Sequence, residues 1–416
     1  MRMYAAGQWI DAEKKIDVLS PYDGTVVDRV PCADLGDVEN TMERAVRGAR
    51  TMAALPGYDR YRILRAAADL IETRSEEFAR TITLEEGKSL AESRFEVSRA
   101  VQTMTLSAEE AKRLHGETIP FDGAPGAAGK FGFTLRVPCG VVVAISPFNF
   151  PLNLVCHKVG PALAAGNAVV IKPATDTPLS ALKLTEVLLD AGLPADGIAC
   201  LTGLGAEIGD ALCRDRRVRK ITFTGSRDVG ERICHMAGIK KVTMELGGNS
   251  PVIIMPDADL DKVALAVAAT GYSNAGQVCI STQRVLTSEK IYGDFLDALK
   301  PKVAVLTTGN PLDERTKVGP MIREKEAIRV EEWVDEAVAG GAQVVTGGVR
   351  HGAIYAPTVV AEVSPDMRIF RDELFGPVVA VTRFDSIDEA ISLANDTIYG
   401  LAAGIFTENL EWAMRF

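Results

Sequence analysis

Three side chains in this sequence could together carry out covalent catalysis. Cys279 follows a small, glycine-containing turn at residues 274–277, between an apolar helical segment and a strand-like segment, so its thiol can face a cleft. Asn149 lies among aromatic and proline residues, and Glu245 ends an alternating segment directly before a pair of glycines. A thiol nucleophile, an amide donor and a carboxylate, each at the junction of a strand and a turn, form a plausible covalent catalytic set.

Each of these residues also has a purely structural interpretation. Cysteine is among the most buried residue types, so Cys279 alone would suit a core position. An asparagine beside prolines, such as Asn149, commonly forms a turn. The alternation along residues 241–245 would bury Glu245, and a buried glutamate is rare unless it is paired or functional. A free thiol with a pKa of about 8.5 needs help at neutral pH, and no histidine stands in a pairing motif, so we expect Glu245 to be the base.

A further segment suggests a site for a pyrophosphate. Residues 220–224 form a strand that runs into Gly225-Ser226 and then into a helix. A turn of small residues at a helix N-terminus binds pyrophosphate through free N–H groups and the helix dipole. The turn lacks the Gly-x-Gly-x-x-Gly pattern, and so does the segment around Gly205, so a plain helix-capping turn is an equally good interpretation.

Lys172 and Thr175 strengthen the case for a nucleotide, because they follow the end of the apolar segment 168–171. Nucleotides bind at the carboxyl ends of the strands of parallel sheets. This position offers an ammonium and a hydroxyl and no carboxylate that would bind a ribose diol. A cation tolerates a 2′-phosphate, so the residues favour NADP, or use of both nucleotides, over NAD alone.

The elements around these residues alternate between short strands and helices. Helices are expected at 34–55 and within 57–115. The first α/β series is expected to have strands 141–145, 168–172, 198–201, 220–223, 241–245 and 251–255 with helices 152–165 and 179–191. The second is expected to have helices 259–273, 290–303, 321–339 and 386–395 with strands 284–288, 342–346, 354–363 and 401–407. This order predicts open, mostly parallel sheets.

Residues 118–136 interrupt the first series with a glycine- and proline-rich segment whose second half alternates. This pattern predicts a projecting hairpin, an arm that often makes subunit contacts. The capped helix expected from Leu410 ends with the chain at Phe416. We therefore expect the chain to be a shortened form of a longer protein.

The composition excludes several classes of function. The 416 residues include 46 Lys and Arg against 56 Asp and Glu, a net charge of −10 that argues against general binding of nucleic acid or anionic membranes. The N-terminus has no apolar secretory segment. The seven cysteines include no Cys-x-x-Cys pair, which favours reduced thiols in the cytoplasm over disulfides and predicts no metal site.

Six motifs, spread in order over essentially the whole chain, resemble the aldehyde dehydrogenase superfamily. They are Phe148-Asn149-Phe150-Pro151, Lys172-Pro173-Ala174, Phe223-Thr224-Gly225-Ser226, Glu245-Leu246-Gly247-Gly248, Gly276-Gln277-Val278-Cys279 and Glu373-Leu374-Phe375-Gly376-Pro377. The resemblance implies an α/β fold with two open, parallel-sheet, Rossmann-like domains: an NAD(P)-binding domain over 1–117 and 137–247, and a catalytic domain over 248–416. It also implies that the hairpin at 118–136 supports a homodimer or homotetramer.

The resemblance assigns a role to each motif. Cys279 would be the nucleophile, Glu245 the base, and Asn149 the side-chain half of an oxyanion hole completed by the Cys279 N–H. Hydride transfer would leave a thioester that Glu245 helps water to hydrolyse, giving a free acid. The cofactor would be NAD or NADP, held by Ile145, Ser146, Pro147, Lys172, Thr175, Gly205, Gly225, Ser226, Leu246, Gly247, Glu373 and Phe375.

The resemblance also bears on the substrate. Many NAD-preferring members have Glu where this chain has Thr175, which again favours NADP. The segment 151–158 resembles the branch that acts on lactaldehyde and glyceraldehyde 3-phosphate, so we expect a small hydroxyaldehyde. His157 could face an anionic tail, although a surface role suits it better, and Arg284 suits a structural role. The alternatives are a succinate-semialdehyde-type dehydrogenase, a thiol enzyme without hydride transfer, and a non-catalytic fragment of the fold, since the family's C-terminal segment is expected to be missing.

Overall fold

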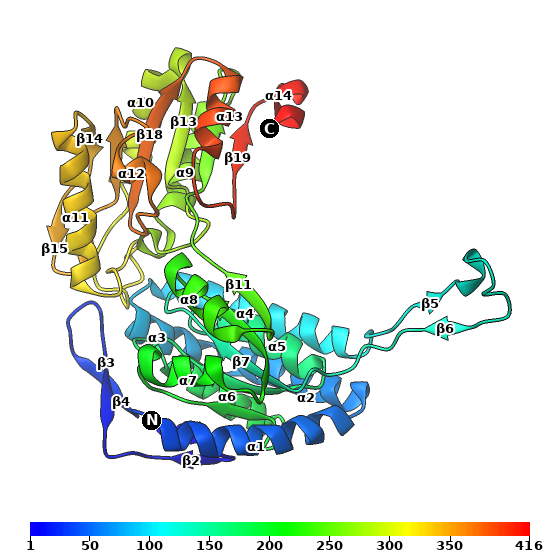
Figure 1. The fold of residues 1–416 in the computed structure, drawn as a ribbon. Helices are drawn as coiled ribbons and strands as arrows, with labels where there is room; N and C mark the ends of the chain where they lie inside the picture. Colours follow the sequence, from blue (N-terminus) through cyan, green and yellow to red (C-terminus); the bar gives the residue numbers. More distant parts are fainter.

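The computed structural model describes all 416 residues, which form two lobes and a projecting arm (Figure 1). Each lobe has its own sheet and its own apolar core. The core of the first lobe draws on residues between Met3 and Ala237. The core of the second lobe draws on residues between Ile253 and Ala394. This arrangement confirms the expected α/β fold with two parallel-sheet units and a hairpin.

The sheet of the first lobe has seven strands in the order β11-β10-β7-β8-β9-β1-β2. Its strands are β1 (Met3–Ala5), β2 (Gln8–Ile10), β7 (Val141–Ile145), β8 (Ala168–Lys172), β9 (Ile198–Cys200), β10 (Val218–Thr224) and β11 (Lys241–Glu245). The strands from β7 to β11 are parallel, whereas β1 pairs antiparallel with β9 and β2. The central strands β7 and β8 are almost completely buried, as expected for strands covered on both faces.

Eight helices belong to the first lobe. They are α1 (Leu35–Ala54), α2 (Gly57–Thr73), α3 (Ser75–Glu86), α4 (Leu90–Ala111), α5 (Asn153–Ala164), α6 (Leu179–Asp190), α7 (Asp210–Arg214) and α8 (Arg227–Ala237). Helices α5 and α6 pack directly on strands, while α2 and α4 pack against them from outside. Helix α4 begins with a capping box in which Ser89 and Glu92 bond each other's backbone N–H groups.

The sheet of the second lobe has six strands in the order β14-β17-β18-β13-β12-β19. They are β12 (Pro251–Ile254), β13 (Arg284–Ser288), β14 (Gln343–Thr346), β17 (Thr358–Ala361), β18 (Val378–Phe384) and β19 (Gly404–Phe406), all parallel except β14. The helices of this lobe are α9 (Leu260–Gly271), α10 (Tyr292–Ala304), α11 (Glu324–Ala339), α12 (Arg368–Arg371), α13 (Ile387–Asn395) and α14 (Leu410–Arg415). A small ribbon, β15 (Arg350–His351) with β16 (Ile354–Tyr355), lies beside α11.

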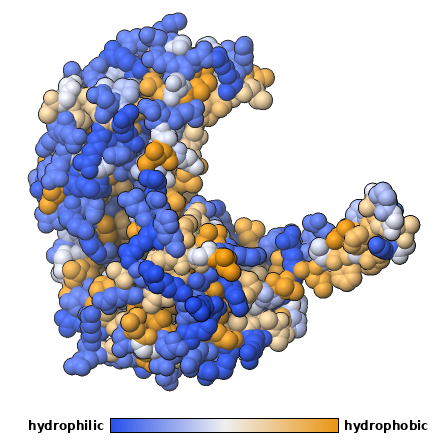
Figure 2. All heavy atoms as spheres, in the orientation of Figure 1, coloured by the Kyte–Doolittle hydropathy of each residue, from blue (hydrophilic) through white to orange (hydrophobic).

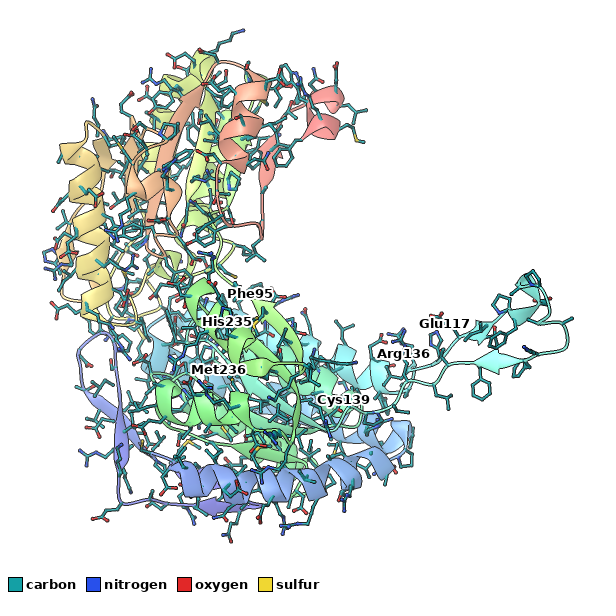
Figure 3. The ribbon with its side chains drawn as sticks, in the orientation of Figure 1. Phe95, Glu117, Arg136, Cys139, His235 and Met236 are labelled. Atoms are coloured by element: carbon teal, nitrogen blue, oxygen red, sulfur yellow. The ribbon has the colours of Figure 1, made fainter.

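The arm is a hairpin in which β5 (Thr118–Ile119) pairs with β6 (Gly132–Phe133). Figure 3 shows Glu117 and Arg136 on its two sides, where it leaves the first lobe. Apolar side chains such as Phe131 and Leu135 are more than two-thirds exposed along it, and Figure 2 shows hydrophobic surface on the arm. No helix of the protein is long and apolar enough to cross a membrane.

The structure adds strands that the sequence did not predict. Strands β1 and β2 have three residues each and join through a turn in which Ala6 and Gly7 have positive φ. A second N-terminal ribbon pairs β3 (Lys15–Leu19) with β4 (Val26–Pro31). Strands this short carry too little alternation to be recognised. The expected strand 354–363 is also divided into β16 and β17, because Pro357 interrupts it.

Candidate active site

Four parallel strands end at one edge of the first sheet and bring most of the expected cofactor residues together. The register places Ile145 of β7 beside Lys172 of β8 on one side and Phe223 of β10 on the other. It also places Thr224 of β10 beside Glu245 of β11. The turns after these strands contain Ser146, Thr175, Gly225 and Leu246, so residues far apart in the sequence share one edge.

Lys172 is buried at this edge and makes only neutral hydrogen bonds. Its Nζ donates to the carbonyl of Pro173 at 2.9 Å and to the Thr175 hydroxyl at 3.5 Å. Burial lowers the pKa of Lys172 to about 8, an effect that Asp176 partly opposes. The Asp176 carboxylate is itself paired with Arg323 of the second lobe at 2.5 Å. A cation without a direct carboxylate partner here would favour an anionic group.

The start of α8 offers unused backbone donors. Ser226 precedes the helix, is exposed, and makes no side-chain capping bond. A Cβ on Gly230 would lie 2.4 Å from the Leu246 side chain, so this glycine lets the helix pack closely on the segment after β11. The buried Ser146 hydroxyl has no hydrogen-bond partner. Open N–H groups, an unpaired hydroxyl and a buried ammonium at one edge fit a dinucleotide.

The turn before Cys279 has an unusual backbone. Asn274, Ala275 and Gly276 have φ values of 50°, 51° and 70°, three consecutive left-handed residues. A Cβ on Gly276 would lie 2.0 Å from the Gly376 carbonyl oxygen, so only glycine fits there. Left-handed backbone at non-glycine residues persists only when the surroundings hold it. The turn leaves the Cys279 side chain partly exposed.

Asn149 joins this turn although it belongs to the other lobe. Its side chain is 4% exposed, and its Nδ2 donates to the Gln277 carbonyl at 2.8 Å. Gln277 in turn accepts a hydrogen bond from the Ile322 N–H through its side-chain oxygen. The Asn149 amide is therefore bonded to Gln277, two residues before the candidate nucleophile in the sequence.

Two carboxylates affect the pKa of the thiol. Burial raises the pKa of Cys279, and the negative charges of Glu373 and Glu245 raise it further. Glu373 accepts a hydrogen bond from the Gly248 N–H at 3.0 Å. A Cβ on Gly248 would lie 2.5 Å from the Cys279 carbonyl oxygen, so the glycine pair permits a close approach to the nucleophile turn.

Phe375 and Gly247 complete the expected cofactor residues on this side of the site. A Cβ on Gly247 would lie 2.2 Å from a carboxylate oxygen of Glu373, so a larger residue would displace that carboxylate. Phe375 has a φ of 50° and meets the Phe148 ring edge to face, with the ring centroids 6.0 Å apart. Gly205 lies apart from these contacts, with open space where a Cβ would stand.

The expectation that Glu245 is buried is wrong. Glu245 is exposed, and so are Lys241, Val242 and Thr243 of the same strand. Strand β11 is the edge strand of its sheet, with β10 as its only neighbour. Alternation therefore says nothing about burial here, because little packs on either face. The carboxylate remains close enough to influence Cys279.

Lys158 was missed by the sequence analysis. It lies on α5, is 5% exposed, and donates from Nζ to the Thr224 hydroxyl. Burial lowers its pKa to about 8, and the charge of Glu245 opposes this shift. Its signal in the sequence was a lysine inside the mostly apolar helix 153–164, where a cation needs a reason to be buried.

A groove of about 390 Å³ lies between α4 and α5 and includes His157. Its polar lining contains Arg99, whose one side-chain hydrogen bond goes to Gln102 and which makes no ion pair. His157 is exposed, with Nε2 3.4 Å from the Thr103 hydroxyl. The charges of Lys158 and Arg99 lower the His157 pKa beyond the effect of burial, and Glu245 opposes them.

Arg284 has the structural role expected for it. Its guanidinium is fully buried and donates to the carbonyls of Asn249, Leu393 and Ala394. The bonds to Leu393 and Ala394 satisfy carbonyls in the last turn of α13.

Comparisons with known proteins agree with the two-lobed α/β fold and with the candidate site. The profile of the "Aldehyde dehydrogenase family" matches residues 9–416, so the expected loss of a C-terminal segment is not borne out by this match. The chain is 50% identical to the 3-sulfolactaldehyde dehydrogenase of Priestia megaterium over 99% of its own length and 86% of that protein. It is 46% identical to aspartate-semialdehyde dehydrogenase 1 of Pseudomonas canavaninivorans over 97% and 85%.

Solved structures show the same fold. An NADP-dependent glyceraldehyde-3-phosphate dehydrogenase from Bacillus halodurans, solved with NADP, superposes with a TM-score of 0.97 at 36% identity. The superposition covers 100% of this chain and 87% of that one.

Proposed function

The chain belongs to the aldehyde dehydrogenase family, and we propose that Cys279, Asn149 and Glu245 carry out its reaction. It is an NAD(P)-dependent aldehyde dehydrogenase, an enzyme that oxidises a small-molecule aldehyde. The observation that carries the assignment is the bond from Asn149 Nδ2 to the Gln277 carbonyl. It places an amide donor beside the turn of the one thiol that two carboxylates influence.

The Cys279 thiol, which is partly exposed, first loses its proton to solvent, and the thiolate then adds to the aldehyde carbon. The carbonyl oxygen becomes an oxyanion, which Asn149 Nδ2 and the Cys279 N–H stabilise; preorganised donors of this kind contribute about 10²- to 10³-fold. The Asn149 amide nitrogen has two N–H donors, so one can remain on the Gln277 carbonyl while the other binds the oxyanion. A bound nicotinamide supplies the acceptor for the hydride that leaves the carbon, and Cys279 retains the acyl group as a thioester.

Glu245 completes the cycle by removing a proton from water as that water attacks the thioester. The acid is released and the thiol recovers its proton. The exposed position of Glu245 suits this role, because both the water and the proton must exchange with solvent. Burial lowers the pKa of Lys158 to about 8, and the charge of Glu245 favours the charged form of this lysine.

The nucleotide would lie along the strand edge of the first lobe, and residues 1–117 with 137–247 would form its binding domain. Residues 248–416 would then supply the nucleophile and form the catalytic domain. Lys172 and Thr175 would hold the adenosine end, the open N–H groups after Ser226 the pyrophosphate, and Glu373 the nicotinamide ribose. A cation without a direct carboxylate partner at Lys172 favours NADP, with dual use as the alternative.

The substrate would be a small aldehyde with an anionic tail. Arg99 has no ion pair in a groove that also contains His157, whereas the one carboxylate of the lining, Glu110, is paired with Arg113. The groove thus offers a free cation in a protein whose net charge is −10. The names of the three relatives above all describe aldehydes with a sulfonate, carboxylate or phosphate group. A neutral small hydroxyaldehyde such as lactaldehyde is the alternative.

A matched pair of substrates tests both the catalytic assignment and the preference for an anionic tail. NADPH and NADH formation would be followed with 3-sulfolactaldehyde and with lactaldehyde, which differ only in the sulfonate. We expect higher kcat/KM for the anionic substrate, and Arg99→Gln should remove about 1–3 kcal/mol of that preference. Arg80→Gln, on the exposed surface of α3, is the control. Equal kcat/KM for both substrates would reject the anionic tail, and no turnover of any aldehyde would reject the catalytic assignment.

The arm would join copies of this chain into a homo-oligomer. Its exposed Phe131, Phe133 and Leu135 form apolar surface that a single copy does not cover. Sedimentation of Phe131→Ser/Leu135→Ser beside the unaltered protein tests this; an unchanged sedimentation coefficient would reject the arm as the contact.

A further inference from the structure

The segment 86–96, from the last residue of α3 into α4, carries buried ionisable groups that the reaction above does not use. Glu86, Lys88 and Glu96 are each at most 1% exposed. Burying three ionisable groups together is costly unless their bonds are complete. Glu92 is half-buried; one carboxylate oxygen caps α4 through Ser89, and the other bonds the nucleophile turn.

Lys88 and Glu96 hold the residues around Asn149. Lys88 Nζ donates to Glu96 at 2.7 Å and to the Asn149 carbonyl at 2.6 Å, and it lies 3.9 Å from the centre of the Phe150 ring. The other carboxylate oxygen of Glu96 accepts the N–H groups of Leu152 and Asn153, both at 2.9 Å. The start of α5 is therefore fixed from one side.

Glu86 and Glu92 hold the nucleophile turn of the other lobe. Glu92 accepts the Asn274 N–H at 2.7 Å and the Ser273 hydroxyl at 3.0 Å. Glu86 accepts Asn274 Nδ2 at 2.8 Å. The same Nδ2 lies 3.1 Å from the Asn149 carbonyl, so Lys88 and Asn274 meet on one oxygen. These bonds hold both the backbone and the side chain of Asn274, the first of the three left-handed residues before Cys279.

We propose that Glu86, Lys88, Glu92 and Glu96 are positioning residues that set the separation between the Asn149 amide and the Cys279 turn. This inference rests on the proposed function, since it needs Asn149 as the oxyanion donor. The bonds come from one segment and reach both partners of the oxyanion hole, which lie in different lobes. Loss of the bonds around Asn149, or of the bonds to Asn274, would let the amide and the turn shift relative to each other.

A double-variant cycle tests this. Lys88→Met keeps the length of the side chain and removes its donor, and kcat/KM for the aldehyde should fall about tenfold or more, because an oxyanion donor is displaced. The effect should lie in kcat/KM and kcat, with nucleotide binding by fluorescence unchanged. In the Asn149→Ala background the same substitution should cost less than about twofold, because residues that act through one group are non-additive.

Two controls keep the outcomes distinct. Lys183→Met removes an ion pair with Glu77 outside the segment and should leave kcat/KM unchanged. If Lys88→Met does not fold, Asn274→Gly removes the amide bridge while tolerating the left-handed backbone, and it should show the same dependence on Asn149. Equal losses in both backgrounds would overturn the proposal. Full activity of Asn149→Ala alone would instead overturn the oxyanion assignment on which it rests.

Discussion

The turn before Cys279 and the strand that ends at Glu245 are built in opposite ways. The turn is buried, has three left-handed residues, and is bonded by side chains of the first lobe although it belongs to the second. Strand β11 is an exposed edge strand with one neighbour. The difference follows from the two tasks proposed for them. Oxyanion stabilisation depends on donors fixed to within fractions of an ångström, whereas deprotonation of water needs access to solvent.

The largest effect is expected at the rigid region. Cys279→Ala removes the only nucleophile of the proposed mechanism, so turnover should fall by about 10³-fold or more. Nucleotide binding should remain, because the strand edge of the first lobe is unchanged. Absorbance of NAD(P)H measures turnover, and fluorescence titration measures nucleotide binding. Cys234→Ala, an exposed thiol on α8, is the control; equal losses in both variants would contradict the assignment of Cys279.

A smaller and different effect is expected at the exposed strand. Glu245→Gln removes the base for the water but not the donor for the oxyanion, so steady-state turnover should fall by about 10²-fold. Stopped-flow absorbance should then show a burst of NAD(P)H equal to the enzyme concentration, followed by slow turnover. Glu231→Gln, an exposed glutamate on α8, should behave like the unaltered enzyme. If the burst were lost together with turnover, Glu245 would act before hydride transfer. The proposed division of tasks between the turn and the strand would then be wrong.

The turn before Cys279 should also be far less tolerant of a single added methyl group than an open helix position elsewhere in the second lobe. Gly276→Ala combines positive φ with a Cβ 2.0 Å from a carbonyl oxygen, so it should destabilise the fold by about 2–4 kcal/mol. Gly293→Ala in α10 has open space around its Cβ and should change stability by less than about 1 kcal/mol. Thermal unfolding of the two variants compares them, and similar midpoints would show that the turn is not held tightly.

The smallest effect concerns the thiol itself. The charge of Glu373 raises the Cys279 pKa, so Glu373→Gln should lower it. Below the thiol pKa, the rate of alkylation by iodoacetamide follows the thiolate fraction. At pH 7 without nucleotide the variant should therefore react about two- to fivefold faster, and both proteins should react faster as the pH rises. A slower reaction of the variant would reverse the sign of the charge effect.

Much of the fold could be predicted from periodicity alone. The strands that end at Ile145, Lys172 and Glu245 were expected with these ends, because apolar segments alternate with helical ones. Strands of three residues, such as β1 and β2, leave no periodic signal. The burial of Glu245 was mispredicted because alternation cannot tell an edge strand from a central one.

The candidate site could be predicted only as far as its motifs reached. The positions of Asn149 and Cys279 follow from the family motifs, but the bond between Asn149 and Gln277 joins residues 128 apart in the chain. The contacts of Glu86 and Glu92 with Asn274 span 188 and 182 residues. No local pattern marks such pairs, so the positioning segment and the groove at Arg99 were visible only in three dimensions.

The most direct test of the account is the mass of the acylated enzyme. Glu245→Gln would be mixed with aldehyde and NADP or NAD, quenched in acid during the burst, digested and analysed by mass spectrometry. The account predicts an acyl group of the substrate on the peptide that contains Cys279, and none when the nucleotide is left out, because the thioester forms only after hydride transfer. An unmodified Cys279 peptide during a full burst, or the acyl group on another cysteine, would contradict it.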